Sequence, residues 1–278
     1  MISLITASLD TLKPFFDILF QSIIEHTKLI DEVLLPCGDH ENGFLEEWSV
    51  RGIKFIKFGA KQQVFNVASP ATICLDHAFN LHAGIDRAKN DYVLLSDPDV
   101  FFYGATDKFY MDLIHKYNLN YIGVSHPAAI TQAFTYFPNV LNCMGKKSEF
   151  PDKEFLKEKL YLDYVFPTEC AGQHVPIPGK FLATGPLPNT SHEFPNPTGH
   201  FETGCNMVLW AKEKKWNWLS FQTADCFNYT SQYYRGTVKP DRLPRTKLIY
   251  HATNGSTKHE NFTRFKETYE LSKELRDD

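Results

Sequence analysis

The residues with the clearest chemical potential are two aspartates one residue apart, in the stretch LLSDPDVFFY from residue 94 to residue 103. In an extended chain, side chains at positions i and i+2 project to the same side, so Asp97 and Asp99 can face one ligand. Pro98 disfavours helical geometry at Asp97, which favours such an extended segment. Two carboxylates suit a hard divalent cation such as Mg²⁺ or Mn²⁺. The same triplet is also common in exposed turns, so both interpretations stand at this point.

Strands and helices alternate around this pair of aspartates. Short runs rich in apolar and β-branched residues predict strands at residues 2–8, 32–36, 53–58, 91–96 and 121–125, and a later one at 247–252. Apolar residues at spacings of three and four predict a helix that begins near Pro14, two more at about 72–89 and 107–117, and a last one at about 259–275.

This order predicts an α/β fold with a Rossmann-like sheet, largely parallel in its first half and covered by helices on both faces. Such sheets bind ligands beyond the carboxyl ends of their strands, where Asp97 and Asp99 are expected. From His126 to about Gly199 the chain is rich in proline and glycine, which is typical of long functional loops. We expect a single domain over residues 1–278, with a loop-rich second half.

Composition excludes several classes of protein. The net charge of −4 supplies no basic field for nucleic acid or an anionic membrane. No stretch approaches the roughly 20 apolar residues of a membrane span. The six cysteines are scattered, without a CxxC pair, which argues against a structural zinc site. The first ten residues lack the basic region of a signal peptide, so a reducing, cytoplasmic setting is expected.

The stretch GIDRAKNDYVLLSDPDV, residues 84–100, resembles the central signature of family 2-like glycosyltransferases of the GT-A fold. In that family a helix ending in a G-I-x-x-A-x-G-x-Y pattern enters an apolar strand that delivers an Asp-x-Asp pair. Six residues fall in register: Gly84, Ile85, Ala88, Tyr92, Asp97 and Asp99. Asn90 stands where glycine is usual, and Leu81-His82 replaces the common Arg-Asn, so we expect either departure to alter how the donor binds. The resemblance covers roughly residues 1–125.

The resemblance implies that residues 1–125 bind a nucleotide-sugar and that residues 126–278 bind the acceptor. The loop after the first strand would contact the nucleotide through Thr6, Ala7 and Ser8. Asp39, after the second strand, is similar to the acidic residue that bonds the uracil or the ribose, although it also fits a surface turn.

The resemblance also implies roles for the Asp-x-Asp pair and for a histidine near the carboxyl terminus. Asp97 would meet the sugar or ribose and the metal, and Asp99 would be the firmer metal ligand. His251, at the end of the strand KLIYHA, is similar to a histidine that many GT-A enzymes place against the metal or diphosphate, although strand-end histidines are often structural. Lys258, shortly after it, could neutralise phosphate or be a solvated surface charge.

An inverting transfer requires a general base, which the second half must supply. Glu202, in the stretch GHFETG, is the first candidate, because a lone glutamate between aromatic and glycine residues suits a cleft. Asp225, in QTADCFN, is the second. Each could instead be a hydrogen-bonded structural carboxylate.

These observations predict a glycosyltransferase that uses Mn²⁺ or Mg²⁺ to move a sugar from a nucleotide donor, a UDP-sugar first, to a hydroxyl of a glycan. Inversion is favoured, and a retaining mechanism stays open. Two alternatives remain: a sugar-nucleotide nucleotidyltransferase and a non-catalytic glycan-binding module of the same fold. The first would normally carry a Gly-rich, basic loop after the first strand, whereas TASLDTLKPF has neither glycine nor arginine.

Overall fold

The structure is a computed structural model. It describes residues 1–7, 12–38, 44–60, 70–125, 138, 142–150, 211, 214–222, 233–238, 240, 247–252 and 259–274.

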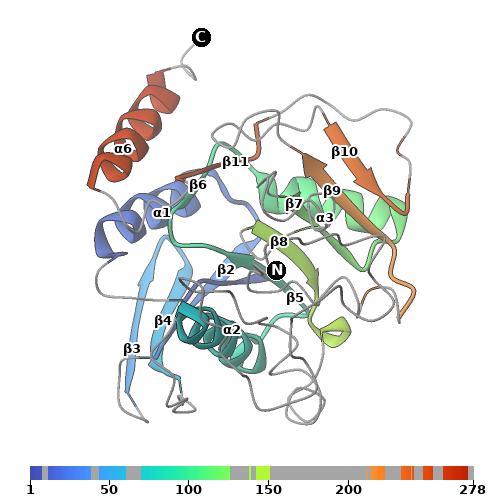
Figure 1. The fold of residues 1–278 in the computed structure, drawn as a ribbon, viewed down its shortest axis with the longest axis horizontal. Helices are drawn as coiled ribbons and strands as arrows, with labels where there is room; N and C mark the ends of the chain where they lie inside the picture. Colours follow the sequence, from blue (N-terminus) through green and yellow to red (C-terminus); the bar gives the residue numbers. More distant parts are fainter. Residues whose placement is uncertain are drawn as a thin grey trace.

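A nine-stranded sheet forms the centre of the molecule, in the order β10-β9-β7-β8-β5-β1-β2-β4-β3 (Figure 1). Its strands are β1 (Ile2–Ile5), β2 (Ile30–Cys37), β3 (Leu45–Val50), β4 (Ile53–Gly59), β5 (Tyr92–Ser96), β7 (Tyr121–Ser125), β8 (Asn142–Lys146), β9 (Trp218–Gln222) and β10 (Tyr233–Gly236). A separate two-stranded sheet pairs β6 (Val100–Phe102) with β11 (Ile249–His251).

The direction of the strands divides the large sheet. β4, β2, β1 and β5 run parallel to one another, as the alternation of strands and helices predicts. β8 then lies antiparallel between β5 and β7, and β3 and β10 pair antiparallel at the two edges. The sheet is therefore mixed. β8 comes from the stretch after Ser125 that the sequence predicted to be irregular, and β3, β6, β9 and β10 were also not predicted.

Helices cover both faces of the sheet. The described helices are α1 (Lys13–His26), α2 (Pro70–Arg87), α3 (Thr106–Tyr117) and α6 (His259–Glu274), and a short 3₁₀ helix follows β8 (Lys147–Glu149). Ile5 contacts α2, whereas its neighbour Leu4 joins the core cluster that contains residues of α1 and α3. Because successive strand residues point to opposite faces, α2 covers one face and α1 and α3 the other. The predicted α/β class, with a sheet covered by helices on both faces, is confirmed.

The first residue of the family-like signature has a packing role. A Cβ atom built on Gly84 would collide with the side chain of Ile5 on β1. Only glycine therefore lets α2 approach the sheet this closely. Ile85 and Ala88, the next two signature residues, are also buried. This stretch thus fixes how α2 sits on β1, independently of any chemistry.

Aromatic side chains fasten the small β6–β11 sheet to the helices. Phe101 of β6 stacks on Tyr250 of β11, with ring centroids 5.1 Å apart. Phe101 also meets Phe265 and Tyr269 of α6 edge-on. The Tyr269 hydroxyl donates to Glu25 of α1 over 3.0 Å. Figure 1 shows α6 beside α1 at one side of the molecule. The last helix thereby holds the strand that carries His251.

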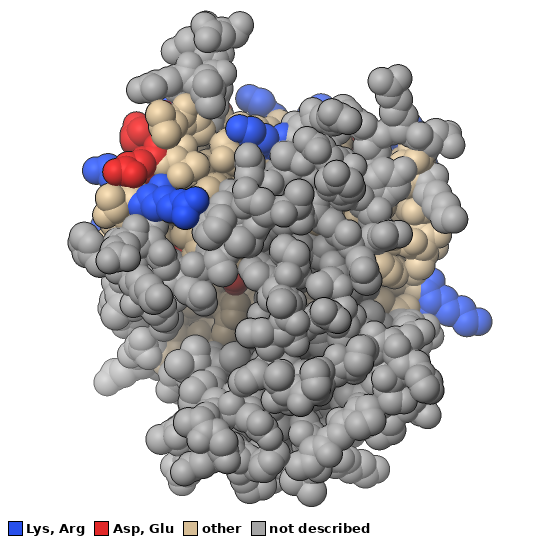
Figure 2. Space-filling view, turned by 45° about the horizontal axis from the view of Figure 1, so that its top comes forward, with Lys and Arg blue, Asp and Glu red and all other residues tan. Residues whose placement is uncertain are grey.

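On the face drawn in Figure 2, acidic and basic side chains of the described residues lie next to each other at the upper left, and other basic side chains lie apart from them. In the described part of the chain, no helix combines the length and the apolar character needed to cross a membrane.

Candidate active site

The Asp97-Pro98-Asp99 triplet lies at the carboxyl edge of the parallel strands. Asp97 follows the last residue of β5, and β6 begins immediately after Asp99. Pro98 and Asp99 form a turn between the two strands, so the expectation of one continuous extended segment is wrong. The turn is nevertheless not a solvated one, because Asp99 is buried, with 7% exposed. The triplet is therefore both a turn and a candidate ligand site.

His251 reaches this turn through the pairing of β11 with β6. His251 stands opposite Val100, and the backbone N–H of Ala252 donates to the Asp99 carbonyl over 2.9 Å. The Nε2 atom of His251 lies 3.4 Å from Oδ1 of Asp99. Two backbone-paired strands thus fix an imidazole beside a carboxylate, and both side chains are only 10% exposed.

Asp97, Asp99 and His251 form a compact group of possible ligands, named here the Asp–Asp–His group. One ligand atom from each residue lies within 4.8 Å of the other two. Two carboxylates this close repel each other unless a positive charge lies between or beside them. Two hard oxygens and one imidazole nitrogen are a donor set that a divalent ion such as Mn²⁺ accepts. The residues present therefore fit the cation that the sequence predicted.

A buried thiol lies near this group but has a different character. Cys143 of β8 is fully buried and contacts the Tyr121 hydroxyl, with its sulfur 2.6 Å from that oxygen. Burial raises the pKa of the Cys143 thiol, the Tyr121 contact lowers it, and the negative charge of Asp97 raises it further. The thiolate is the form that binds metals, so Cys143 remains a neutral core residue rather than a ligand.

One residue of the site was missed in the sequence. His77 of α2 places its Nε2 atom 3.6 Å from Oδ1 of Asp97. The signal that could have found it is its position seven residues before Gly84, about two helical turns away and thus on the same helix face. The apolar pattern of α2 indicates instead the residues that pack in the core.

The predicted nucleotide loop begins at the same edge of the sheet. Ile5 of β1 pairs with Leu95 of β5, so Thr6 follows β1 where Ser96 ends β5. The Thr6 side chain is fully buried, and within the described part of the chain its Oγ1 has no hydrogen-bond partner. Ala7 is 7% exposed. Contact of Thr6 and Ala7 with a nucleotide stays a prediction.

The remaining predicted site residues lie outside the described residues. They are Ser8, Asp39, Glu202, Asp225 and Lys258. Their predicted roles in binding the nucleotide, activating the acceptor and neutralising phosphate therefore stay predictions.

Asn90, the first departure from the family-like signature, lies far from this site. Its side-chain amide donates to Asp31 of β2 over 2.7 Å and to the Ser3 hydroxyl of β1 over 3.1 Å. Asn90 precedes β5 and Asp97 follows it, so roughly 16 Å of strand separates them. Asn90 therefore ties β1 and β2 together at the opposite edge of the sheet, and its effect on donor binding stays a prediction.

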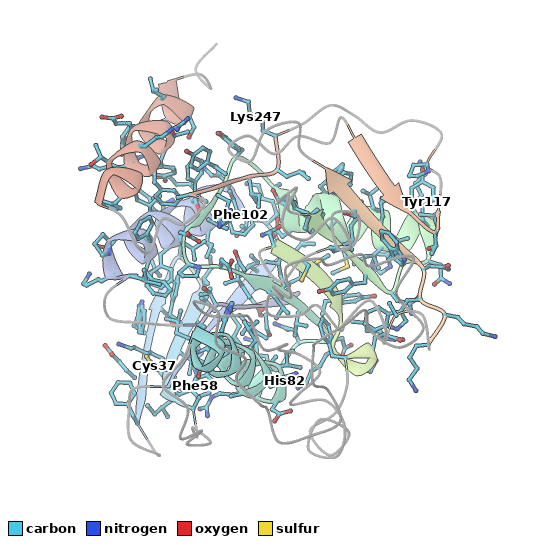
Figure 3. The ribbon with its side chains drawn as sticks, in the orientation of Figure 1. Cys37, Phe58, His82, Phe102, Tyr117 and Lys247 are labelled. Carbon is cyan, nitrogen blue, oxygen red and sulfur yellow. The ribbon has the colours of Figure 1, made fainter. Side chains whose placement is uncertain are left out.

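His82, in the second departure, is a core residue on α2 (Figure 3). Burial lowers its pKa from 6.5 to about 3, so the imidazole is neutral at physiological pH. A neutral, buried side chain contributes no charge to the site. Its role is therefore in packing α2, and we expect its titration to affect stability.

Comparisons with known proteins reach only part of this chain. No family model matches the sequence, and no curated protein matches it. One similar solved structure is S. aureus TarS 1-349, at 13% identity and a TM-score of 0.37, covering 60% of this chain and 50% of that one. TarS 1-349 in complex with UDP-GlcNAc is 12% identical with a TM-score of 0.37, covering 60% and 48%. The glycosyltransferase GlyE of Streptococcus pneumoniae TIGR4 is 15% identical with a TM-score of 0.37, covering 56% and 36%.

This chain therefore spans half or less of the length of those structures. At these low identities and TM-scores, the comparisons assign no function to this chain.

Proposed function

We propose that this chain is a metal-dependent glycosyltransferase that moves a sugar from a UDP-sugar to a hydroxyl of a glycan. The observation that carries the proposal is the convergence of the Asp–Asp–His group at the carboxyl end of β5. In open α/β sheets this edge is where ligands bind. The family-like register of residues 84–100 assigns the same two aspartates to the same task.

Asp97, Asp99 and His251 would hold the divalent cation. Mn²⁺ suits this set better than Mg²⁺, which is bound mainly through oxygen atoms and keeps several waters. When bound, the cation offsets the negative charge that develops on the departing nucleoside diphosphate. Asp99 and His251 lie beside each other and are each 10% exposed, so they would be the firmer ligands. Asp97, which is 25% exposed, would also face the donor.

The transfer itself requires a base on the acceptor side. Glu202 is the first candidate and Asp225 the second. In an inverting reaction the carboxylate removes the proton from the acceptor hydroxyl. At the same time the oxygen of that hydroxyl bonds to the anomeric carbon of the donor sugar. The bond from that carbon to the phosphate oxygen breaks, and the electron pair leaves with the nucleoside diphosphate.

The donor is assigned to the first half of the chain. Thr6, Ala7, Ser8 and Asp39 would contact the nucleoside, and Lys258 would lie against the diphosphate. Residues 126–278 would bind the acceptor. His251 comes from this second half yet joins the aspartates of the first, so the ion would link the two halves.

Two measurements test the proposal. A thermal-shift screen of UDP- and GDP-sugars with MnCl₂ finds the donor, because a ligand that binds only the folded state raises its stability. Release of nucleoside diphosphate from that donor, with glycan acceptors, is then measured with Mn²⁺ and after chelation. Turnover that chelation abolishes and MnCl₂ restores is the expected result.

The alternatives give different results. Glycan binding without turnover of any UDP- or GDP-sugar identifies a glycan-binding module. Formation of a nucleotide-sugar from a nucleoside triphosphate and a sugar phosphate identifies a nucleotidyltransferase. For the base, Glu202→Gln should abolish transfer while donor affinity stays within about threefold. Transfer at the wild-type rate by Glu202→Gln would assign the role of base to Asp225, or would indicate a retaining reaction.

A further inference from the structure

His77 occupies the half of α2 that lies near the carboxyl edge of the sheet. β4 ends at that edge, α2 returns the chain to the opposite edge, and β5 then leads to Asp97. Seven residues make nearly two turns of a helix, so His77 and Gly84 share the face that packs on the sheet. The close contact of Gly84 with Ile5 sets the height of α2 and therefore of His77.

The contact of His77 with Asp97 has a definite geometry. Nε2 of His77 lies 3.6 Å from Oδ1 of Asp97, and that oxygen is buried. The two side chains are 23% and 25% exposed, so neither is fully enclosed. The contact is longer than a hydrogen bond, and a small rotation of either side chain would close it.

Each carboxylate of the turn is thus faced by one imidazole, from a different element. Asp99 is faced by His251 of β11 at 3.4 Å, and Asp97 by His77 of α2 at 3.6 Å. His77 does not belong to the Asp–Asp–His group that the described residues form. It contacts the group through Asp97 and lies outside that set of three possible ligands.

We propose that His77 is a positioning residue, which holds Oδ1 of Asp97 so that the other carboxylate oxygen stays directed to the cation and the donor. Asp97 follows the last residue of β5, where strand pairing ceases to restrain it. Partners of this kind, which orient metal ligands, typically change metal affinity by roughly 10–100-fold when removed. The inference rests on the proposed function, since it presupposes a cation at the Asp–Asp–His group.

The test is titration of the protein with MnCl₂ by isothermal calorimetry, with no nucleotide present. His77→Ala should weaken Mn²⁺ binding by about 10-fold or more. His77→Gln, which keeps an N–H donor of similar reach, should stay within about threefold of wild type. His115→Ala is the matched control, because His115 is an exposed helical histidine that packs on Tyr92 at the other end of β5. It should bind Mn²⁺ as wild type does.

The outcomes separate this inference from the proposed function. Wild-type Mn²⁺ affinity in His77→Ala, with loss of binding in Asp99→Asn, overturns the role of His77 and leaves the metal site intact. Equal Mn²⁺ binding by wild type and Asp99→Asn overturns the metal site itself. If His77→Ala unfolds, the comparison of His77→Gln with His77→Met replaces it. Weak Mn²⁺ binding by folded His77→Met, together with strong Mn²⁺ binding by His77→Gln, supports the N–H contact. Equal affinities in those two variants contradict it.

Discussion

The side chains of Asp99 and His251 meet where a backbone hydrogen bond ties together the two chain segments that carry them. His251 Nε2 lies 3.4 Å from Asp99 Oδ1, and the N–H of the next residue, Ala252, donates to the Asp99 carbonyl. The β6–β11 pairing thus sets the separation of imidazole and carboxylate before any ligand arrives. This pair of possible ligands is therefore already positioned before a cation binds.

Asp99→Asn should weaken Mn²⁺ binding by more than the roughly 10–100-fold expected from loss of an orienting partner. The amide keeps the shape of the side chain but removes the negative charge that the cation requires. Calorimetric titration with MnCl₂ measures the change. Asp112→Asn is the control, because Asp112 is exposed on α3 and pairs with Lys108. Equal affinity in the two variants would exclude Asp99 as a ligand.

Gly84→Ala should lower the free energy of unfolding by about 1–3 kcal/mol, the typical cost of overpacking a core. The added methyl group collides with Ile5, which lies under α2. Urea denaturation measures the loss. Gly104→Ala is the matched control, since a Cβ on Gly104 meets nothing within 4 Å.

A double-mutant cycle isolates the contact between α2 and β1. Ile5→Ala removes the atoms that the new methyl group would strike, so Gly84→Ala should cost less in that background. An equal cost in both backgrounds would show that the strain arises elsewhere.

Asn90→Gly should reduce stability while leaving Mn²⁺ affinity unchanged. The substitution restores the residue usual in the family-like signature, but it removes the hydrogen bonds to Ser3 and Asp31. Loss of these bonds, together with the greater freedom of glycine in the unfolded chain, should cost about 1–3 kcal/mol. Denaturation and calorimetry on the same samples check both halves. A change in Mn²⁺ affinity at wild-type stability would contradict the placement of Asn90 away from the site.

His82 should make the protein less stable as the pH falls. Its pKa is about 3 in the folded protein, against 6.5 as the ordinary value. Between these values the unfolded chain binds a proton that the folded chain does not, so stability rises with pH in that range and levels off above 6.5. From pH 7.5 to pH 5 the loss from this residue should be about 2 kcal/mol.

The comparison with His82→Asn isolates that contribution from the titration of carboxylates. The variant should lose about 2 kcal/mol less than the wild type over the same range, as measured by urea denaturation at each pH. Equal losses of stability in the two proteins would show that His82 binds its proton in the folded protein as readily as in the unfolded chain.

Local sequence patterns predicted most of the first half of the fold. The strands that become β1, β2, β4, β5 and β7, and the helices α1, α2 and α3, carry apolar residues at the spacing of a strand or a helix. The sequence did not predict β3, because it is an edge strand whose exposed residues, such as Glu46 and Glu47, give no apolar alternation. β6 is only three residues long, and β8 lies inside the stretch after Ser125 that the sequence predicted to be irregular.

By itself, the sequence determined that two carboxylates follow a buried strand and that a glycine-led helix precedes it, because both features depend on neighbours along the chain. Only the tertiary structure decided that His251 meets Asp99, that His77 meets Asp97, and that Asn90 lies at the opposite edge. Those contacts depend on which strands pair, in which direction, and on how deeply α2 packs against β1. Such choices are made by segments distant in the sequence that bury their surfaces together, so no local pattern records them.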